Sequence, residues 1–517
     1  MKCRKKGLKI IGWFLFSVVI TFMALSTFCL IWARRYYGNI GFEEIVFHLR
    51  IPIEGTSKRI LLNFAKNCIF PTAVCMVIWF VLIIPCKRCK KTFRIPLGKK
   101  AHIQLYPFRL PTGVWLVLIA IWIIAMISLA NYFWGFSKYV SNQIQTSTLI
   151  EEEYVDPGNV EIVFPKEKRN LICIWVESAE TSTQDTEHGG VFEENYIKEM
   201  TDLALNNVSF SQSNQLEGAV VAPACGWTIA GLVAQTSGMP LKLGAYDDRG
   251  FDNSMGRYGS FLPGATTLGD ILAEQGYQNY FVAGSDFNFG GRTKYFTQHG
   301  NYQIFDYYSA IEEGKISEDY YEWWGFEDEK LYAYSKEKLL ELAEQEQPFN
   351  FSLLTVDTHH EDGYLCPNCP DTYDSQYANV WSCASRQLND FVEWIKDQEF
   401  YDNTTIVILG DHCSMDSDFY EGYIYDKHHG TTERKVYNAF INAVPTPINE
   451  KDRLFTTMDY FPTILASIGV KIEGNRLGLG TNLFSEEKTL SEKYGYDKLF
   501  EELDKKSTFY NEELLFP

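Results

Sequence analysis

The segment TTIVILGDHCSMD, residues 404–416, joins a continuous apolar run to an acid and an imidazole that follow it directly. An apolar run without alternation is typical of a strand buried on both faces of a sheet. Four more such runs occur between helical stretches: LICIWV (171–176), YFVAG (280–284), FSLLTV (351–356) and AFINAV (439–444). Strands alternating with helices predict an α/β domain built on a doubly wound parallel sheet.

Charged and imidazole side chains follow four of these runs. In chain order they are Glu177; Asp286 and Arg292; Asp357, His359 and His360; and Asp411 and His412. One strand with a charged residue after it is unremarkable, but parallel sheets gather ligands beyond the carboxyl ends of their strands. Carboxylate and imidazole together form a ligand set for a divalent ion such as Mn²⁺ or Zn²⁺. The four strand ends therefore predict one shared site.

The segment PACGWTIAGLVAQ, residues 223–235, offers a nucleophile. Pro223 and Gly226 interrupt regular structure, and TIAGLVAQ reads as a helix that begins at Thr228. A helix start favours phosphate, and a metal ion would activate the hydroxyl. The alternative interpretation is that Thr228 is only an N-cap. Cys225 lacks the residues that follow the oxidised cysteine of sulfatases, which disfavours a sulfuric-ester hydrolase.

The first 135 residues contain three apolar runs, at 8–32, 67–86 and 112–134, each long enough for a transmembrane helix. Buried core helices are the alternative, but soluble helices rarely remain apolar on every side. No small-x-small cleavage motif follows the first run, which disfavours a signal peptide. We expect a multi-pass membrane domain over residues 1–135.

The charge distribution orients this membrane domain. Residues 1–150 carry 20 Lys and Arg against 3 Asp and Glu, whereas residues 151–517 carry 27 against 63. The N-terminus and the loop CKRCKKTFRIPLGKK (86–100) are basic and are expected in the cytoplasm. Three spans then place the acidic domain outside the cytoplasm. Its negative charge also disfavours a nucleic-acid partner. GFEEIVFHLR (41–50) is expected on the outer surface.

The remaining boundaries follow from composition. Pro157, Gly158 and Pro165 predict an extended linker over 136–168, followed by a catalytic domain over 169–480 and a C-terminal tail over 481–517. In the catalytic domain, Cys366 and Cys369 form half of a zinc-knuckle pattern without a second half. An extracytoplasmic domain favours a disulfide instead, with Cys383 as a candidate partner; the pairing is left open.

At these motifs the sequence resembles the lipoteichoic acid synthase and phosphoglycerol transferase family of the alkaline phosphatase/sulfatase superfamily. The similarity is densest over residues 168–470 and is carried by five segments in the family's order. These are RNLICIWVESAE (169–180), ACGWTIAGLVAQTSGMPL (224–241), FVAGSDFNFGGRTKYFTQHG (281–300), LLTVDTHHEDG (353–363) and TTIVILGDHCSMD (404–416). The second segment is closest to the glucan phosphoglycerol transferases. Teichoic acid synthases usually have five spans rather than three.

The resemblance implies a set of roles. Glu177, Thr228, Asp411 and His412 would bind one metal ion, expected to be Mn²⁺, with Zn²⁺ or Mg²⁺ as alternatives. Thr228 would be the catalytic nucleophile. The donor would be phosphatidylglycerol, and the acceptor a surface glycan or a polyol phosphate. A phosphoethanolamine transferase, a phosphodiesterase and an inactive surface-binding module are the rival interpretations.

Substrate binding is the remaining role that the resemblance assigns. Arg292 and His359 would bind the phosphate and glycerol. Asp286 is included with them as a substrate-binding candidate, because it follows the same predicted strand as Arg292.

Overall fold

The computed structural model describes residues 2–37, 40–50, 56, 58–80, 93–97, 101–105, 112–243, 260–416, 419–420, 434–515 and 517. The chain divides into two compact units. Unit 1 comprises residues 1–39 and 56–138, and unit 2 comprises residues 40–55 and 139–517.

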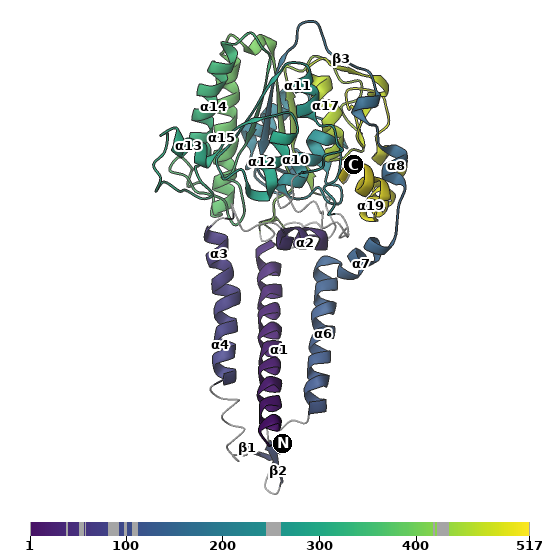
Figure 1. Ribbon diagram of the computed structural model, residues 1–517. Coiled ribbons are helices and arrows are strands. Elements are labelled where there is room, and N and C mark those ends of the chain that lie inside the picture. Colours follow the sequence, from purple (N-terminus) through teal and green to yellow (C-terminus); the bar gives the residue numbers. More distant parts are fainter. Residues whose placement is uncertain are drawn as a thin grey trace. The chain divides into compact units, whose positions relative to one another are not determined.

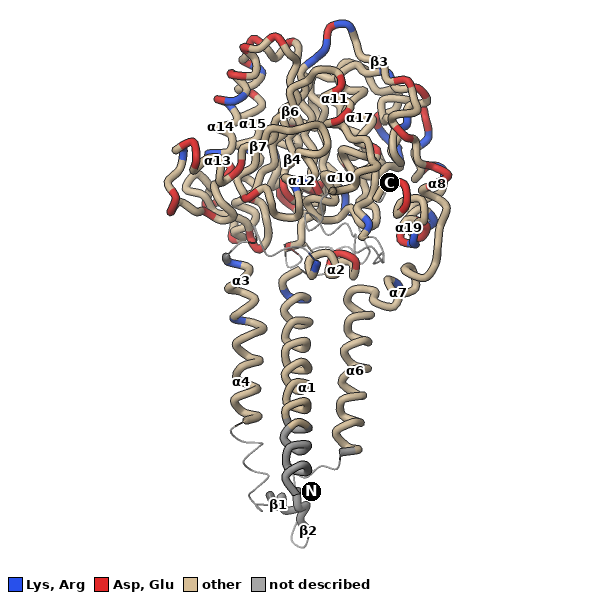
Figure 2. The backbone as a smooth tube through the Cα atoms, in the orientation of Figure 1, with Lys and Arg blue, Asp and Glu red and all other residues tan. Residues whose placement is uncertain are grey.

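Unit 1 is mainly helical (Figure 1). Its elements are α1 (Lys2–Tyr37), α3 (Lys58–Phe64), the π-helix η1 (Ala65–Ile69), α4 (Phe70–Ile78), the paired strands β1 (Phe93–Leu97) and β2 (Ala101–Leu105), and α6 (Thr112–Trp134). Three stretches are long and apolar enough to cross a membrane: Phe14–Tyr37, Arg59–Ile78 and Gly113–Trp134. Figure 2 shows few charged residues along these helices.

The three predicted spans are thus found as helices, with one shift along the chain. The second span was placed at 67–86, whereas the apolar helix begins at Arg59, and residues 81–86 lie outside the described part. The flanking charges of Lys58 and Arg59 do not break the helix, since straight-chain cations are good helix formers.

Unit 2 is organised around a six-stranded sheet with the order β11-β9-β4-β8-β6-β7. The strands are β4 (Asn170–Val176), β6 (Gln278–Ala283), β7 (Gln303–Phe305), β8 (Phe349–Leu354), β9 (Thr404–Gly410) and β11 (Asn438–Ile441). The first five run parallel to one another. β4 lies near the centre, with β8 and β9 on its two sides, so the ends of these three strands share one edge.

Both faces of the sheet are buried. Along β4, Leu171, Cys173 and Trp175 join one apolar cluster, whereas Ile172, Ile174 and Val176 join the other. The first face packs under α10 (Thr228–Ser237), α11 (Leu268–Glu274), α12 (Arg292–Gln298) and α17 (Tyr460–Ser467). The second packs under α9 (Lys198–Asn206), α13 (Tyr307–Glu312), α14 (Asp328–Ala343) and α15 (Gln376–Lys396). This is the doubly wound α/β architecture that the apolar runs predict.

One predicted strand differs in direction. The run AFINAV was expected in a parallel sheet, but β11 pairs antiparallel with β9. Tyr437 explains the reversal: its carbonyl accepts a hydrogen bond from the Gly410 N–H at 2.9 Å, at the carboxyl end of β9. The chain therefore enters β11 beside the end of β9, which sets the antiparallel direction of the pair.

The predicted linker is more structured than its composition suggests. It contains α7 (Phe136–Ile144), α8 (Leu149–Glu153) and β3 (Ile162–Val163), and β3 pairs with β12 (Lys471–Ile472). Glu153 is buried and is bound by Arg476 at 3.1 Å, by Tyr494 at 2.6 Å and by Lys493. Long-range ion pairing thus orders a segment in which the local sequence favours no regular structure.

The smaller elements complete unit 2. They are α2 (Phe42–Arg50), β5 (Ala219–Val220), β10 (Lys435–Val436), β13 (Arg476–Leu477), β14 (Gly480–Thr481), α18 (Leu490–Tyr494), α19 (Tyr496–Asp504) and the π-helix η9 (Tyr510–Leu515). The 3₁₀ turns are η3 (Pro157–Asn159), η4 (Thr181–Thr183), η5 (Phe289–Gly291), η6 (Tyr401–Asn403), η7 (Thr457–Asp459) and η8 (Glu473–Asn475). The domain boundaries predicted at 135, 168 and 480 remain predictions.

Candidate active site

Glu177 occupies the first position after β4 and is 3% exposed. Its backbone N–H donates to Thr355 Oγ1 at 2.9 Å, and its carbonyl accepts from Thr358 Oγ1 at 2.6 Å. Ser178 Oγ donates to Glu177 Oε1 at 2.8 Å. The end of β4 is therefore fixed to the end of β8, and the Glu177 carboxylate is held in one orientation.

Asp411 and His412 follow β9, the other neighbour of β4. Asp411 is fully buried, and its Oδ1 accepts from the backbone N–H groups of Ser178 and His412, each at 2.8 Å. His412 Nδ1 lies 2.8 Å from the Cys413 carbonyl, so Nδ1 carries the proton and donates it. The other ring nitrogen, Nε2, then presents its lone pair to Asp411 Oδ2 at 3.4 Å and Glu177 Oε1 at 3.5 Å.

Thr228 begins α10 and completes the cluster. The N-cap residue is Trp227, and Thr228 Oγ1 makes no capping bond. Instead it donates to Glu177 Oε2 at 3.4 Å and lies 3.3 Å from His412 Nε2. The interpretation of Thr228 as a simple N-cap is therefore wrong, and its hydroxyl belongs to the carboxylate–imidazole cluster.

The cluster has the features of a cation site. Glu177, Asp411 and His412 each offer one donor atom, and these three atoms lie within 4.8 Å of one another. Asp411 Oδ2 is buried and has no hydrogen-bond partner among the described residues. Burial and the charge of Glu177 raise the pKa of Asp411 to about 7. An unpartnered carboxylate oxygen beside a second acid is stabilised by a divalent ion, so these residues fit one.

His412 responds to the same charges. Burial alone would lower the pKa of its imidazole, but the charges of Asp411 and Glu177, with a smaller contribution from Glu44, raise it. A bound cation would lower the pKa of His412 again, because it competes with the proton for Nε2. Nδ1 donation to the Cys413 carbonyl already selects the tautomer that a metal ligand needs.

Arg292 lies at the start of α12 and is 5% exposed. Its guanidinium donates to Phe289 O at 3.0 Å, Ser285 Oγ at 3.1 Å and Asp286 O at 2.8 Å. Burial lowers its pKa to about 10, against the opposing charges of Asp286 and Glu177. Asp286 itself accepts from the Asn288 N–H at 2.9 Å, so its carboxylate supports the turn that positions Arg292.

His359 follows β8 on a half-buried loop. Its ring packs on Trp324, with centroids 4.5 Å apart, and stacks on His360 at 4.7 Å. His359 Nδ1 lies 2.8 Å from the His360 carbonyl, and burial lowers the pKa of the imidazole. His359 is therefore neutral near pH 7, with Nε2 as its proton acceptor.

Trp324 is a residue of this region whose position beside His359 the sequence does not predict. It is 7% exposed, and its ring also lies against Phe289, with centroids 5.4 Å apart. Trp323 and Trp324 together suggest a contact with the lipid interface, which stays a prediction. Five of the seven residues in YYEWWGF (320–326) are aromatic, so the sequence does not favour one ring over another at the site. Contact with both His359 and Phe289 is visible only in the fold.

The helix α2 packs on Trp227, the residue before Thr228. Phe47 is 1% exposed and packs on Trp227, with centroids 4.8 Å apart, and the Leu243 N–H donates to Glu43 Oε1 at 3.3 Å. Glu44 is 6% exposed and lies 3.7 Å from His48. The segment 41–50, expected at an outer surface, thus belongs to the same compact unit as the site.

The structure therefore brings together Glu177, Thr228, Asp411 and His412. Arg292 and His359 do not hydrogen-bond to this cluster among the described residues; the charge of Glu177 acts on both. The catalytic, metal-binding and substrate-binding roles of these residues remain predictions.

Known proteins give the following matches. The sequence profile of the sulfatase family matches residues 169–470, which is more than half of the chain. Phosphoglycerol transferase I of Xanthomonas euvesicatoria is 30% identical over 326 residues, which are 62% of this chain and 43% of that protein. Phosphoglycerol transferase I of Escherichia fergusonii is 33% identical over 273 residues, 51% of this chain and 33% of that protein. The matches thus span less than half the length of these relatives.

Solved structures give more distant matches. The lipoteichoic acid synthase LtaP from Listeria monocytogenes is 18% identical, with a TM-score of 0.47 over 66% of this chain and 82% of that one. The lipooligosaccharide phosphoethanolamine transferase A from Neisseria meningitidis is 12% identical, with a TM-score of 0.48 over 89% of this chain and 85% of that one.

Proposed function

We propose that this chain, which belongs to the sulfatase family, is a membrane-bound transferase that moves phosphoglycerol from phosphatidylglycerol to a cell-surface acceptor. One observation carries the proposal: the Thr228 hydroxyl lies at a helix start within 3.4 Å of a carboxylate and an imidazole that fit a metal site. The phosphoglycerol transferases among its relatives support the choice of head group.

The proposed reaction has two displacements at phosphorus. Thr228 Oγ1 loses its proton and bonds to the phosphorus of phosphatidylglycerol, while the bond to the diacylglycerol oxygen breaks. Diacylglycerol leaves with a proton, and glycerophosphate stays on Thr228. An acceptor hydroxyl then bonds to the same phosphorus, and the bond to Oγ1 breaks. The enzyme is regenerated, and the acceptor carries the phosphoglycerol.

A divalent ion held by Glu177, Thr228, Asp411 and His412 would acidify the hydroxyl and neutralise phosphate charge. The proposed ion is Mn²⁺, with Zn²⁺ or Mg²⁺ as alternatives. The donor set contains no thiolate and two carboxylates, which suits a hard or borderline ion.

Arg292 and His359 have complementary parts in this proposal. The buried guanidinium of Arg292 supplies positive charge for the phosphate in a domain that is acidic overall. His359, neutral and with Nε2 as acceptor, is suited to take the proton from the acceptor hydroxyl in the second step. Asp286 holds the turn before Arg292 and acts on substrate through that residue.

The site must reach a lipid head group, and three candidate spans supply the anchor. We propose that the catalytic domain lies outside the cytoplasm, because the basic flanks of the first and third spans favour the cytoplasmic side. Protease protection in sealed vesicles tests this placement. Cytoplasmic exposure of Thr228 would exclude an extracytoplasmic acceptor.

The deciding experiment uses the full-length chain in detergent with phosphatidylglycerol labelled in its glycerol head group. Thr181, which follows Glu177 closely in sequence, is the rival hydroxyl; its Oγ1 donates to the Lys435 carbonyl at 3.3 Å. Intact-protein mass spectrometry should find glycerophosphate on the wild type and on Thr181→Ala, and none on Thr228→Ala. Phosphatidylethanolamine in place of phosphatidylglycerol separates the rival phosphoethanolamine transferase, which would load its own head group. Release of free glycerophosphate at the same rate with and without an acceptor glycan would identify a phosphodiesterase.

A further inference from the structure

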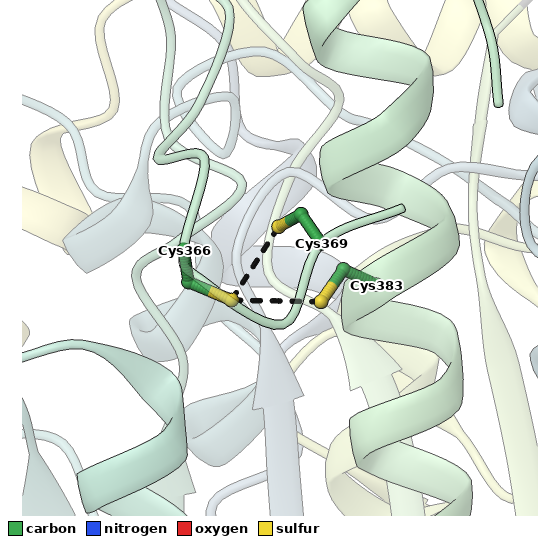
Figure 3. A group of neighbouring side chains, drawn as sticks. All are labelled: Cys366, Cys369 and Cys383. Carbon is green, nitrogen blue, oxygen red and sulfur yellow. Dashed lines mark hydrogen bonds between the residues drawn. The ribbon is translucent and has the colours of Figure 1, made fainter. Parts of the chain in front are cut away.

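Three cysteines from two segments of unit 2 meet in one place (Figure 3). Cys366 and Cys369 lie on the loop after β8, and Cys383 lies in α15. Cys366 Sγ is 3.4 Å from Cys369 Sγ and 3.6 Å from Cys383 Sγ, and all three sulfurs lie within 4.8 Å of one another. Figure 3 shows the three side chains pointing toward a common centre.

The sulfur separations distinguish two kinds of site. A disulfide requires an S–S distance of about 2.0 Å, and the three cysteines are free thiols. In a tetrahedral zinc site, Zn–S bonds of about 2.3 Å place neighbouring sulfurs about 3.8 Å apart. The observed 3.4 Å and 3.6 Å are close to the second value. The sequence favours a disulfide here, but the structure gathers three unbonded thiols.

We propose that Cys366, Cys369 and Cys383 form a thiolate site for a soft divalent metal ion, with Zn²⁺ as the ion that it would take. The Cys-x-x-Cys turn is closed by a 3.0 Å hydrogen bond from the Cys369 N–H to the Cys366 carbonyl, which points two sulfurs the same way. The long helix α15 supplies the third sulfur from a rigid element. Among the described residues no fourth protein ligand joins the group, so water or an added ligand would complete the tetrahedron.

The surroundings of Cys383 suit a thiolate. Gln387 Nε2 lies 3.4 Å from its Sγ, and Arg386 Nη2 lies 3.7 Å from it. Donors of this kind stabilise the deprotonated sulfur that binds metal.

Arg386 also fixes the loop. Its Nη2 donates to the Asn368 carbonyl at 2.8 Å, inside the Cys-x-x-Cys turn. The same loop also carries His359, which lies nearer to β8 in sequence. Tyr364 stands between His359 and Cys366 in the chain, and its N–H donates to the Asp357 carbonyl at 2.7 Å. A metal ion bound by the three sulfurs would hold this loop against α15, and its removal would loosen the loop without touching Glu177 or Asp411.

Cobalt substitution of the full-length chain tests the site. Thiolate-to-Co²⁺ charge transfer absorbs in the near ultraviolet, whereas a site of carboxylate and imidazole gives no such band. We expect the band in the reduced wild type, in Cys29→Ser and in Asp411→Asn. We expect it to be lost in Cys369→Ser and Cys383→Ser, each of which should also contain one zinc fewer by elemental analysis. If Cys383→Ser does not fold, the half-buried Cys369 carries the test.

Two results would overturn the proposal. The first is an absence of the band in reduced wild-type protein, or its persistence in Cys369→Ser. The second is a disulfide between any two of the three cysteines in protein taken directly from membranes, acid-quenched and alkylated before peptide mapping. That result would identify a covalent cross-link among the cysteines that we propose as metal ligands.

Discussion

Gly231 offers a test of how tightly the helix α10 must approach the strand end that carries Asp411. A Cβ added at Gly231 would lie 2.1 Å from the Asp411 carbonyl oxygen and 2.9 Å from its carbonyl carbon. Ordinary contact begins at 3.4 Å, so Gly231→Ala must separate the two backbones by about 1.3 Å. The obstacle is the backbone itself, which cannot rotate away as a side chain would.

Two effects of this substitution oppose each other. In a helix interior, alanine is favoured over glycine by about 1 kcal/mol. Overpacking a buried site costs roughly 1–3 kcal/mol, and a clash with backbone belongs at the upper end. The net expectation is a loss of about 2 kcal/mol of folding free energy, or roughly 2–3 °C in melting temperature for a unit of this size. Since α10 begins at Thr228, a shift near 1 Å should also lower transfer by about 10²-fold.

The assay is differential scanning calorimetry together with diacylglycerol release from phosphatidylglycerol vesicles. Gly226→Ala is the matched control, because its added Cβ meets only Val221 at an ordinary 3.7 Å. It should change the melting temperature by less than about 1 °C and leave turnover near wild type. If Gly231→Ala is as stable and as active as Gly226→Ala, the close approach of α10 to Asp411 does not position the nucleophile.

Three further outcomes are expected. Thr228→Ala should keep the fold, and its rate of diacylglycerol release should fall by roughly 10³-fold or more, because no covalent intermediate forms. Thr181→Ala should remain active. Equal rates for the two variants would refute the assignment of Thr228 as the nucleophile. Asp411→Asn should abolish tight Mn²⁺ binding measured by calorimetry while the melting transition stays cooperative; unchanged binding would remove Asp411 from the ligand set. Burial alone would raise the pKa of Glu153, but its three cationic and phenolic partners hold that pKa below its ordinary value. Its contribution is therefore present at neutral pH and lost as the pH falls through that lowered pKa. Glu153→Gln should destabilise the chain by about 1–3 kcal/mol at pH 7 and by progressively less as the pH falls through that pKa. A pH-independent difference would contradict this.

The sequence predicts the elements whose signal is local. The run 404–410 becomes β9 with the same bounds, and the helix expected after Gly226 begins at Thr228. Residues that depend on long-range contacts are not predictable in this way. Glu153 binds partners more than 300 positions away, and Trp324 meets His359 through the fold alone. The antiparallel direction of β11 likewise depends on where the chain re-enters the sheet, beside Gly410, rather than on its own apolar pattern.

Ser178 shows why the site geometry needs more than its ligands. It adopts a left-handed conformation with φ at 60°, which costs a non-glycine residue roughly 1–3 kcal/mol. In that conformation its N–H donates to Asp411 Oδ1 and its hydroxyl to Glu177 Oε1, so one residue holds a carboxylate from each of two adjacent strands. Each hydrogen bond engages one oxygen of its carboxylate. The second oxygen of Glu177, Oε2, then faces Thr228, and the second oxygen of Asp411, Oδ2, faces His412. The strained conformation of Ser178 therefore fixes two acids that repel each other. Their second oxygens already face the Thr228–His412 side of the cluster before any cation or phosphate binds.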